Sequence, residues 1–174
     1  RSTGWLVTLA NVANGLWIFF WHYAVASYLA SLAAMLVLLA TLITIYLRLD
    51  IGRATFKGIE RWVVAMPFSI YLGWITVATI ANITAVAAYL GWRGAPLSET
   101  VWTVIMLAAG VIVAGLMAFT RRDIAYTAVI LWALAGISVK HAAVPAVALP
   151  TWITFGLVAL TLAAAFFLRG RKSL

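Results

Sequence analysis

The chain has 174 residues, of which 66% are hydrophobic and only 9% are charged, whereas a soluble domain usually carries about 25% charged residues. This composition, with a mean hydropathy of +1.10, excludes a soluble domain and predicts an all-α, polytopic bundle of transmembrane helices. The chain contains no cysteine, which excludes a disulfide framework, thiolate catalysis and a Cys-ligated metal. Membrane topology accounts for the formal net charge of +8, so we expect membrane lipid rather than nucleic acid as a partner.

Six stretches are apolar enough to cross a bilayer, which takes about 20 mostly apolar residues. In chain order they are residues 5–23, 28–47, 63–90, 99–119, 124–139 and 151–168. The fifth is short, and Ser98 and Asp123 are the predicted N-caps of the fourth and fifth. We expect one integral-membrane domain over residues 1–174. The sequence opens with Arg1 rather than methionine, and we expect that it lacks its natural start.

The distribution of basic residues predicts the orientation of these spans. With six spans, both termini, the connector 48–61 and the Arg121–Arg122 turn lie on one side of the membrane. Of the 12 lysines and arginines, only Arg93 and Lys140 then lie on the other side. The positive-inside rule therefore predicts that both termini are cytoplasmic, in a membrane of the inner or cytoplasmic type.

Two of the predicted spans carry an asparagine and large aromatic residues on a single helical face. On the first span these are Asn14, Trp17 and Trp21, spaced i, i+3 and i+7. On the third they are Tyr71, Trp74, Ala78 and Asn82, which fall within about 80° of arc. An amide in hydrocarbon needs a hydrogen-bond partner, so Asn82 should face protein, water or a ligand. Each stripe is consistent with a pocket wall or with a helix interface.

These stripes resemble motifs of the TspO/MBR family of tryptophan-rich sensory proteins, which is related to the mitochondrial translocator protein. Asn14, Trp17 and the Phe19–Phe20 pair resemble the N-x-x-W-x-x-x-F-F signature of that family's third helix, with a shorter interval before the phenylalanines. The third span resembles its fifth helix, P-Y-L-x-W-x-x-x-A-x-x-x-N, although the interval from Pro67 to Tyr71 is looser. This resemblance covers residues 5–89, within a TspO-like half of residues 1–90.

The resemblance implies a helical pocket that accepts porphyrins, haem-related tetrapyrroles, and hydrophobic drugs or sterols. Its ligand-binding residues in this chain would be Asn14, Trp17, Trp21, Tyr71, Trp74, Ala78 and Asn82. His22 is a candidate axial ligand for haem iron or for the magnesium of a (bacterio)chlorophyll; no other metal ligand is expected. The family's first two helices and its lid loop have no counterpart, and residues 98–168 are predicted as three additional helices. We therefore expect an extended branch of the family.

Two classes of function fit these features, and a facilitator of small uncharged solutes is a distant third. The first is a binding protein that senses or transports a flat lipophilic ligand, with a cavity lined by the two stripes. The second is an accessory transmembrane subunit of a larger respiratory or photosynthetic complex, with structural and pigment- or lipid-contacting roles. In that case the stripes are packed solid and the last three helices meet other chains. A homo-oligomer is compatible with both.

An enzyme is the weakest of the classes considered. The four carboxylates lie in connectors or helix caps, at Asp50, Glu60, Glu99 and Asp123. A proton relay through the bilayer therefore has no carboxylate to use, and no two carboxylates are paired for acid–base chemistry. Serine and threonine occur without a histidine–carboxylate pattern, which argues against a hydrolase.

Overall fold

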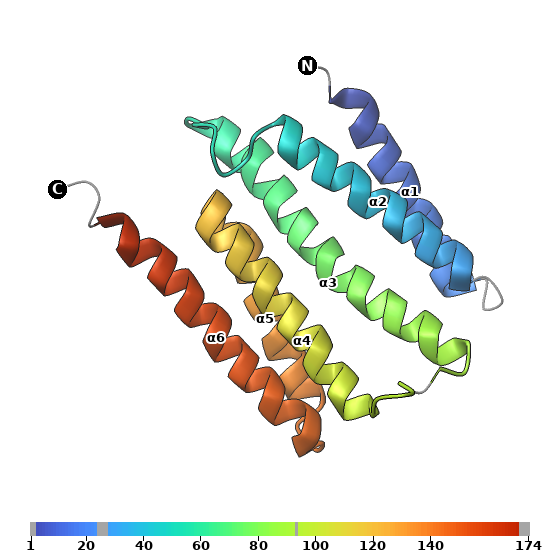
Figure 1. The fold of residues 1–174 in the computed structure, drawn as a ribbon. Helices are drawn as coiled ribbons and strands as arrows, with labels where there is room; N and C mark the ends of the chain where they lie inside the picture. The colour runs from blue at the N-terminus through green and yellow to red at the C-terminus, as the bar shows by residue number, and fades with distance from the viewer. Residues whose placement is uncertain (1–2, 24–27, 93, 171–174) are drawn as a thin grey trace. The chain divides into compact units, whose positions relative to one another are not determined.

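The computed structural model describes residues 3–23, 28–92 and 94–170, and these residues form six α-helices (Figure 1). The helices are α1 (Gly4–Tyr23), α2 (Tyr28–Arg48), α3 (Met66–Tyr89), α4 (Glu99–Leu116), α5 (Ile124–Lys140) and α6 (Pro145–Gly170). Two π-helical turns, η2 (Arg61–Ala65) and η3 (Met117–Arg121), extend α3 at its start and α4 at its end. The predicted all-α class is confirmed.

Five of these helical runs are long and apolar enough to cross a membrane, so the chain is an integral membrane protein. They are Gly4–Tyr23, Tyr28–Arg48, Arg61–Tyr89, Glu99–Arg121 and Pro145–Phe167. Helix α5 is apolar but has only 17 residues, about 25 Å at 1.5 Å per residue, against a hydrocarbon core of about 30 Å. A sixth crossing by α5, which the predicted orientation requires, stays a prediction.

Helix α6 begins six residues before the predicted span, because both prolines of the preceding segment lie inside it. Pro145 is its first residue, where the missing N–H costs nothing because no intrahelical acceptor is available there. Pro150 lies within the helix. One turn later, the hydroxyl of Thr154 donates to the Pro150 carbonyl at 2.8 Å. The predicted start of the sixth span at residue 151 is therefore wrong.

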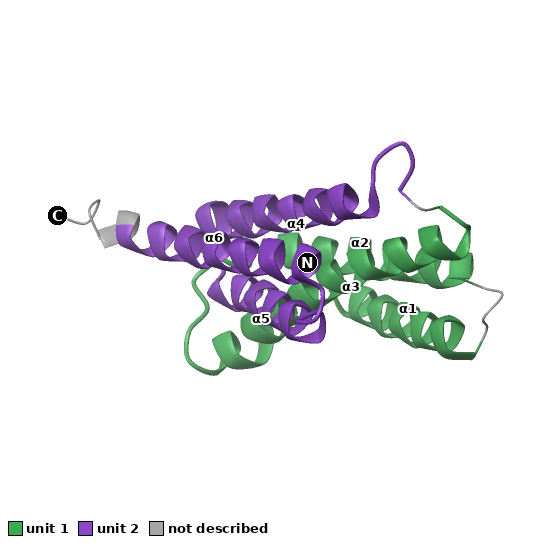
Figure 2. Ribbon diagram, turned by 90° about the horizontal axis from the view of Figure 1, so that it is seen from below, with its two compact units in different colours: residues 1–93 green, residues 94–174 purple. Residues whose placement is uncertain are grey.

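The chain divides into two compact units, residues 1–93 and residues 94–174 (Figure 2). In unit 1, α2 packs against both α1 and α3. Five of its seven buried residues are spaced alternately by four and three positions, namely Ser31, Met35, Leu38, Leu42 and Ile45, and the other two are Thr41 and Tyr46. Helix α1 presents Leu6, Ala10 and Ala13 as buried residues. The small side chains of the two alanines allow the helices to approach closely. The prediction of a single domain is not tested by this division.

In unit 2, α6 packs against both α4 and α5. The α4 run is buried at Ala114 and Ala118. A Cβ added at Gly115 would meet the Thr161 methyl group of α6 at 3.6 Å, an ordinary van der Waals distance. Small residues on the α4 run therefore set the spacing of α4 and α6.

The segment that opens unit 2 is fastened to α4 by a tryptophan. The Trp102 indole N–H donates to the Gly94 carbonyl at 2.6 Å, and Gly94 itself has a positive φ of 91°. Ser98 caps α4 by accepting the Val101 N–H at 3.3 Å. The N-cap predicted for this helix is thus confirmed.

Candidate functional site

The asparagine of the α3 stripe is paired with a serine of α2. The Asn82 Nδ2 donates to the Ser31 Oγ at 3.1 Å, and Asn82 and Ser31 are 2% and 0% exposed. The Ser31 hydroxyl also lies 3.5 Å from Asn82 Oδ1, so the two groups are able to exchange donor and acceptor roles. Protein therefore satisfies the Asn82 amide, which is one of the three surroundings expected for it. Ser31 had no sequence signal that singled it out.

The rest of the α3 stripe turns progressively away from this packed face. Five of the seven buried residues of α3 form a sector centred about 60° around the helix from Tyr71, namely Leu72, Ile75, Thr79, Asn82 and Val86. Tyr71 and Ala78 lie at the edge of this sector and are half-buried. Trp74 lies about 120° from its centre and exposes 43% of its surface. The stripe thus runs from the interface with α2 at Asn82 to the exposed side of α3 at Trp74.

On α1 the predicted stripe overlaps the face that is buried. Trp17 has the same helical phase as the buried residues Leu6, Ala10 and Ala13. Trp17 and Asn14 are half-buried, and the Trp17 Nε1 is a buried donor for which the described residues provide no hydrogen-bond acceptor. Helix packing therefore accounts for part of this stripe.

An aromatic cluster joins one end of each helix in unit 1. The Trp21 ring lies edge-on to Tyr28 with centroids 6.0 Å apart, and Tyr28 lies 4.5 Å from Tyr89. His22, at the exposed end of α1, contacts Tyr23 with ring centroids 5.4 Å apart. Tyr28 and Tyr89 were not predicted as site residues, although Tyr28 is one turn from Ser31 and Tyr89 two turns from Asn82. Aromatic side chains at helix ends are typical of the membrane–water interface.

The predicted site residues therefore lie at different levels along the helices of unit 1. From Trp74 to Tyr89, α3 advances about 22 Å at about 1.5 Å per residue. Because Trp21 meets α3 through Tyr28 and Tyr89, Trp21 and the neighbouring His22 are near the end of the bundle. Trp74 is near the middle of its span. Trp74 and the Trp21–His22 pair are thus at different levels of unit 1, and a single pocket formed by all the predicted residues stays a prediction.

A protein-family model described as TSPO-like protein matches residues 1–166. This chain belongs to the TSPO-like protein family. The match extends well beyond residues 5–89, on which the sequence resemblance was based, and includes α4, α5 and most of α6. Comparisons with curated proteins and with solved structures gave no match.

For the TSPO-like chain, the structure brings together some of the predicted residues and separates others. It joins Asn82 to Ser31 and Trp21 to Tyr28, and it leaves Trp74 exposed. In unit 1 the extensive helix contacts are those of α2 with α1 and α3. A cavity lined jointly by the stripes of α1 and α3 stays a prediction.

Proposed function

We propose that this TSPO-like membrane protein binds a flat lipophilic ligand of the tetrapyrrole class, without catalysing a reaction, on the side of α3 that carries the exposed Trp74. The proposed contact surface, here called the Trp74 face, consists of Tyr71, Trp74 and Ala78. The observation that carries the proposal is the 43% exposure of Trp74 near the middle of the Arg61–Tyr89 span. An indole at that depth is not explained by the interfacial preference of tryptophan.

The chemistry of the Trp74 face suits a planar macrocycle. An exposed indole offers a flat apolar surface for offset stacking, a contact worth about 0.5–1.5 kcal/mol beyond area burial. Ala78 is one turn away on the same side and leaves space beside the ring. The half-buried Tyr71 adds a hydroxyl that is able to orient a polar substituent at the ligand's edge. His22 is outside this proposal because it lies near the end of the bundle.

We further propose that both termini of the chain face the cytoplasm. The support is the charge asymmetry of the connectors, in which only Arg93 and Lys140 fall on the opposite side when α5 crosses the membrane. Sensing or transport of the ligand would then take place in an inner or cytoplasmic type of membrane.

Two observations favour the alternative of an accessory subunit in a larger membrane complex. The Asn82 amide, which a ligand would otherwise use, is already paired with Ser31 inside unit 1. The α1 stripe likewise overlaps a buried helix face. Stripes that serve packing are what an accessory role predicts. In that case the apolar outer surfaces of the helices would contact other chains or their pigments.

Titration of the purified full chain with protoporphyrin IX, followed by tryptophan fluorescence, tests the proposal. We expect saturable quenching, with an affinity that Trp74→Leu weakens by about 2- to 12-fold because it removes the aromatic ring. Ala78→Leu should also weaken the affinity, by filling the space beside that ring. Trp132→Leu is the matched control, because Trp132 is 66% exposed within α5 of the other unit. Circular dichroism checks that each variant keeps its helical fold.

The absence of saturable quenching would contradict the binding proposal, as would an equal loss of affinity in Trp132→Leu. Native co-purification from the source membrane then tests the accessory role. Recovery of the chain in a stable stoichiometric complex would support the alternative.

A further inference from the structure

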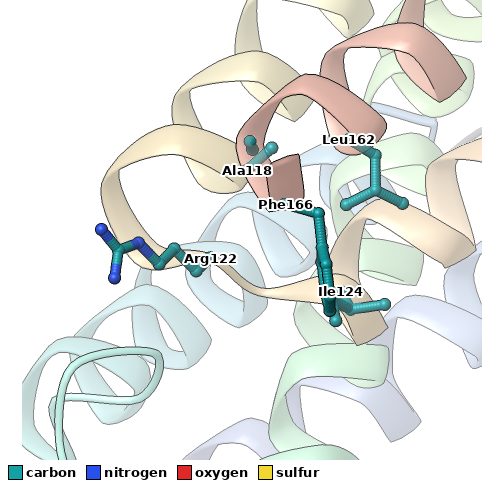
Figure 3. Close-up of a pocket in the computed structure, with 6 residues that line it drawn as sticks. Ala118, Arg122, Ile124, Leu162 and Phe166 are labelled. Atoms are coloured by element: carbon teal, nitrogen blue, oxygen red, sulfur yellow. The ribbon is translucent and has the colours of Figure 1, made fainter. Parts of the chain in front are cut away.

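A shallow pocket of about 30 Å³ lies in unit 2, where the turn between α4 and α5 meets the C-terminal part of α6 (Figure 3). It is lined by Ala118, Arg122, Ile124, Leu162, Ala165 and Phe166. Five of these residues are apolar and one is cationic. The volume is on the order of that of one water molecule, which is too small to enclose a macrocycle or an acyl chain, so a lipid chain would lie over the apolar lining rather than inside the pocket.

The backbone around Arg122 is held on both sides. Arg122 has a left-handed φ of 53°, and its N–H donates to the Met117 carbonyl, which closes the π-helical turn. The next residue, Asp123, caps α5 by accepting the Tyr126 N–H at 3.0 Å. The turn therefore holds the arginine Cα at a defined point beside the pocket.

The two ends of the Arg122 side chain have different surroundings. The residue contributes to the pocket lining, while its guanidinium extends away from Ala118 and Phe166 (Figure 3). A long basic side chain with an apolar stem beside hydrocarbon and a charged end in the headgroup region is typical of membrane interfaces. Asp123 is only 6% exposed whereas Arg122 is exposed, so of these two adjacent charges the arginine's is the accessible one.

We propose that this surface binds an anionic phospholipid. The headgroup phosphate pairs with the Arg122 guanidinium, and an acyl chain lies along Ile124, Leu162 and Phe166. Ile124 and Phe166 are 44% and 59% exposed, so the apolar lining of the pocket is accessible to lipid at these two residues. Charge complementarity selects an anionic headgroup, and the apolar lining selects a lipid over a free phosphate ion. On the proposed topology the turn faces the cytoplasmic leaflet, where anionic lipids are concentrated.

Native mass spectrometry of the full chain in mild detergent, titrated with phosphatidylglycerol or phosphatidylcholine, tests this proposal. We expect tighter retention of phosphatidylglycerol and about a fivefold loss of its affinity in Arg122→Asn. Asparagine removes the charge and tolerates the left-handed backbone. Phe166→Ala, which removes one apolar wall, should also weaken phosphatidylglycerol binding. Lys57→Gln is the matched control, because Lys57 is an exposed cation of unit 1 on the same predicted membrane side.

Equal losses in Arg122→Asn and Lys57→Gln would overturn the proposal, because they indicate diffuse attraction to a basic surface. An unchanged affinity in Arg122→Asn would overturn the placement of the headgroup on Arg122. An unchanged affinity in Phe166→Ala would overturn the placement of the acyl chain along Phe166. Circular dichroism checks the fold of each variant. The lipid site is in unit 2, so Arg122→Asn should leave the protoporphyrin titration unchanged. The lipid proposal and the tetrapyrrole proposal are therefore tested independently.

Discussion

Replacement of Asn82 by alanine should destabilise unit 1 because it removes the amide that joins α3 to α2. The bond from Asn82 Nδ2 to Ser31 Oγ is 3.1 Å long and buried. Hydrogen bonds between membrane helices contribute about 0.6 kcal/mol on average and at most about 1.7 kcal/mol. Removal of one partner that leaves a buried hydroxyl unsatisfied costs about 1–3 kcal/mol in all, which is more than the net contribution of the bond. We therefore expect Asn82→Ala to lower the free energy of unfolding by about 1–3 kcal/mol.

A double-mutant cycle isolates the contribution of the pair itself. The free energy of unfolding is measured for Ser31→Ala, Asn82→Ala and the double variant in mild detergent titrated with a denaturing detergent. The double variant should be less destabilised than the sum of the single variants, by about 0.6–1.7 kcal/mol. Thr84→Ala provides the control, because the Thr84 hydroxyl donates to the Ile80 carbonyl of its own helix and should add independently to Ser31→Ala.

Additivity of Ser31→Ala and Asn82→Ala to within about 0.3 kcal/mol would refute this reasoning, since independent sites add to within that margin. In that case the Asn82 amide would have a role other than joining the two helices, and contact with a ligand would be the first alternative role to test. Because the Trp74 face does not include Asn82, we also expect the Asn82→Ala variant that remains folded to retain protoporphyrin binding.

Two further predictions concern the ends of helices in unit 2. Gly94→Ala should lower the free energy of unfolding by about 1–3 kcal/mol, because the residue has a φ of 91° and its new Cβ would lie 2.9 Å from Trp102 Cδ1; a thermal melt measures this. Gly110→Ala, where nothing lies within 4 Å, should be neutral or stabilising, and an equal loss there would contradict the steric argument. Asp123→Ala and Ser98→Ala each remove an N-cap worth about 0.5–2 kcal/mol. The buried cap at Asp123 should be the more costly to remove, and the reverse order in melting temperature would show that burial does not decide the effect.

The helices of this protein could be predicted from its sequence because a bilayer demands long apolar segments with their backbone groups paired internally. The capping residues Ser98 and Asp123 were predictable for a similar reason, since a helix start leaves N–H groups that a nearby side-chain oxygen satisfies. The start of α6 was not, because Pro145 is compatible with a loop or with the first turn of a helix. Local sequence does not distinguish these two cases.

The sequence by itself determined that the chain is helical and membrane-embedded, and it identified the residues whose polarity or size makes them unusual inside hydrocarbon. Tertiary structure decided which partners those residues have. Asn82 needed a hydrogen-bond partner, but only the packing of α3 on α2 selected Ser31, a residue with no unusual feature of its own. The same packing buried Asn82 and left Trp74 exposed, although both belong to one stripe. Helical periodicity gives the angle between two side chains on one helix, whereas the face that meets a neighbour depends on the neighbour as well.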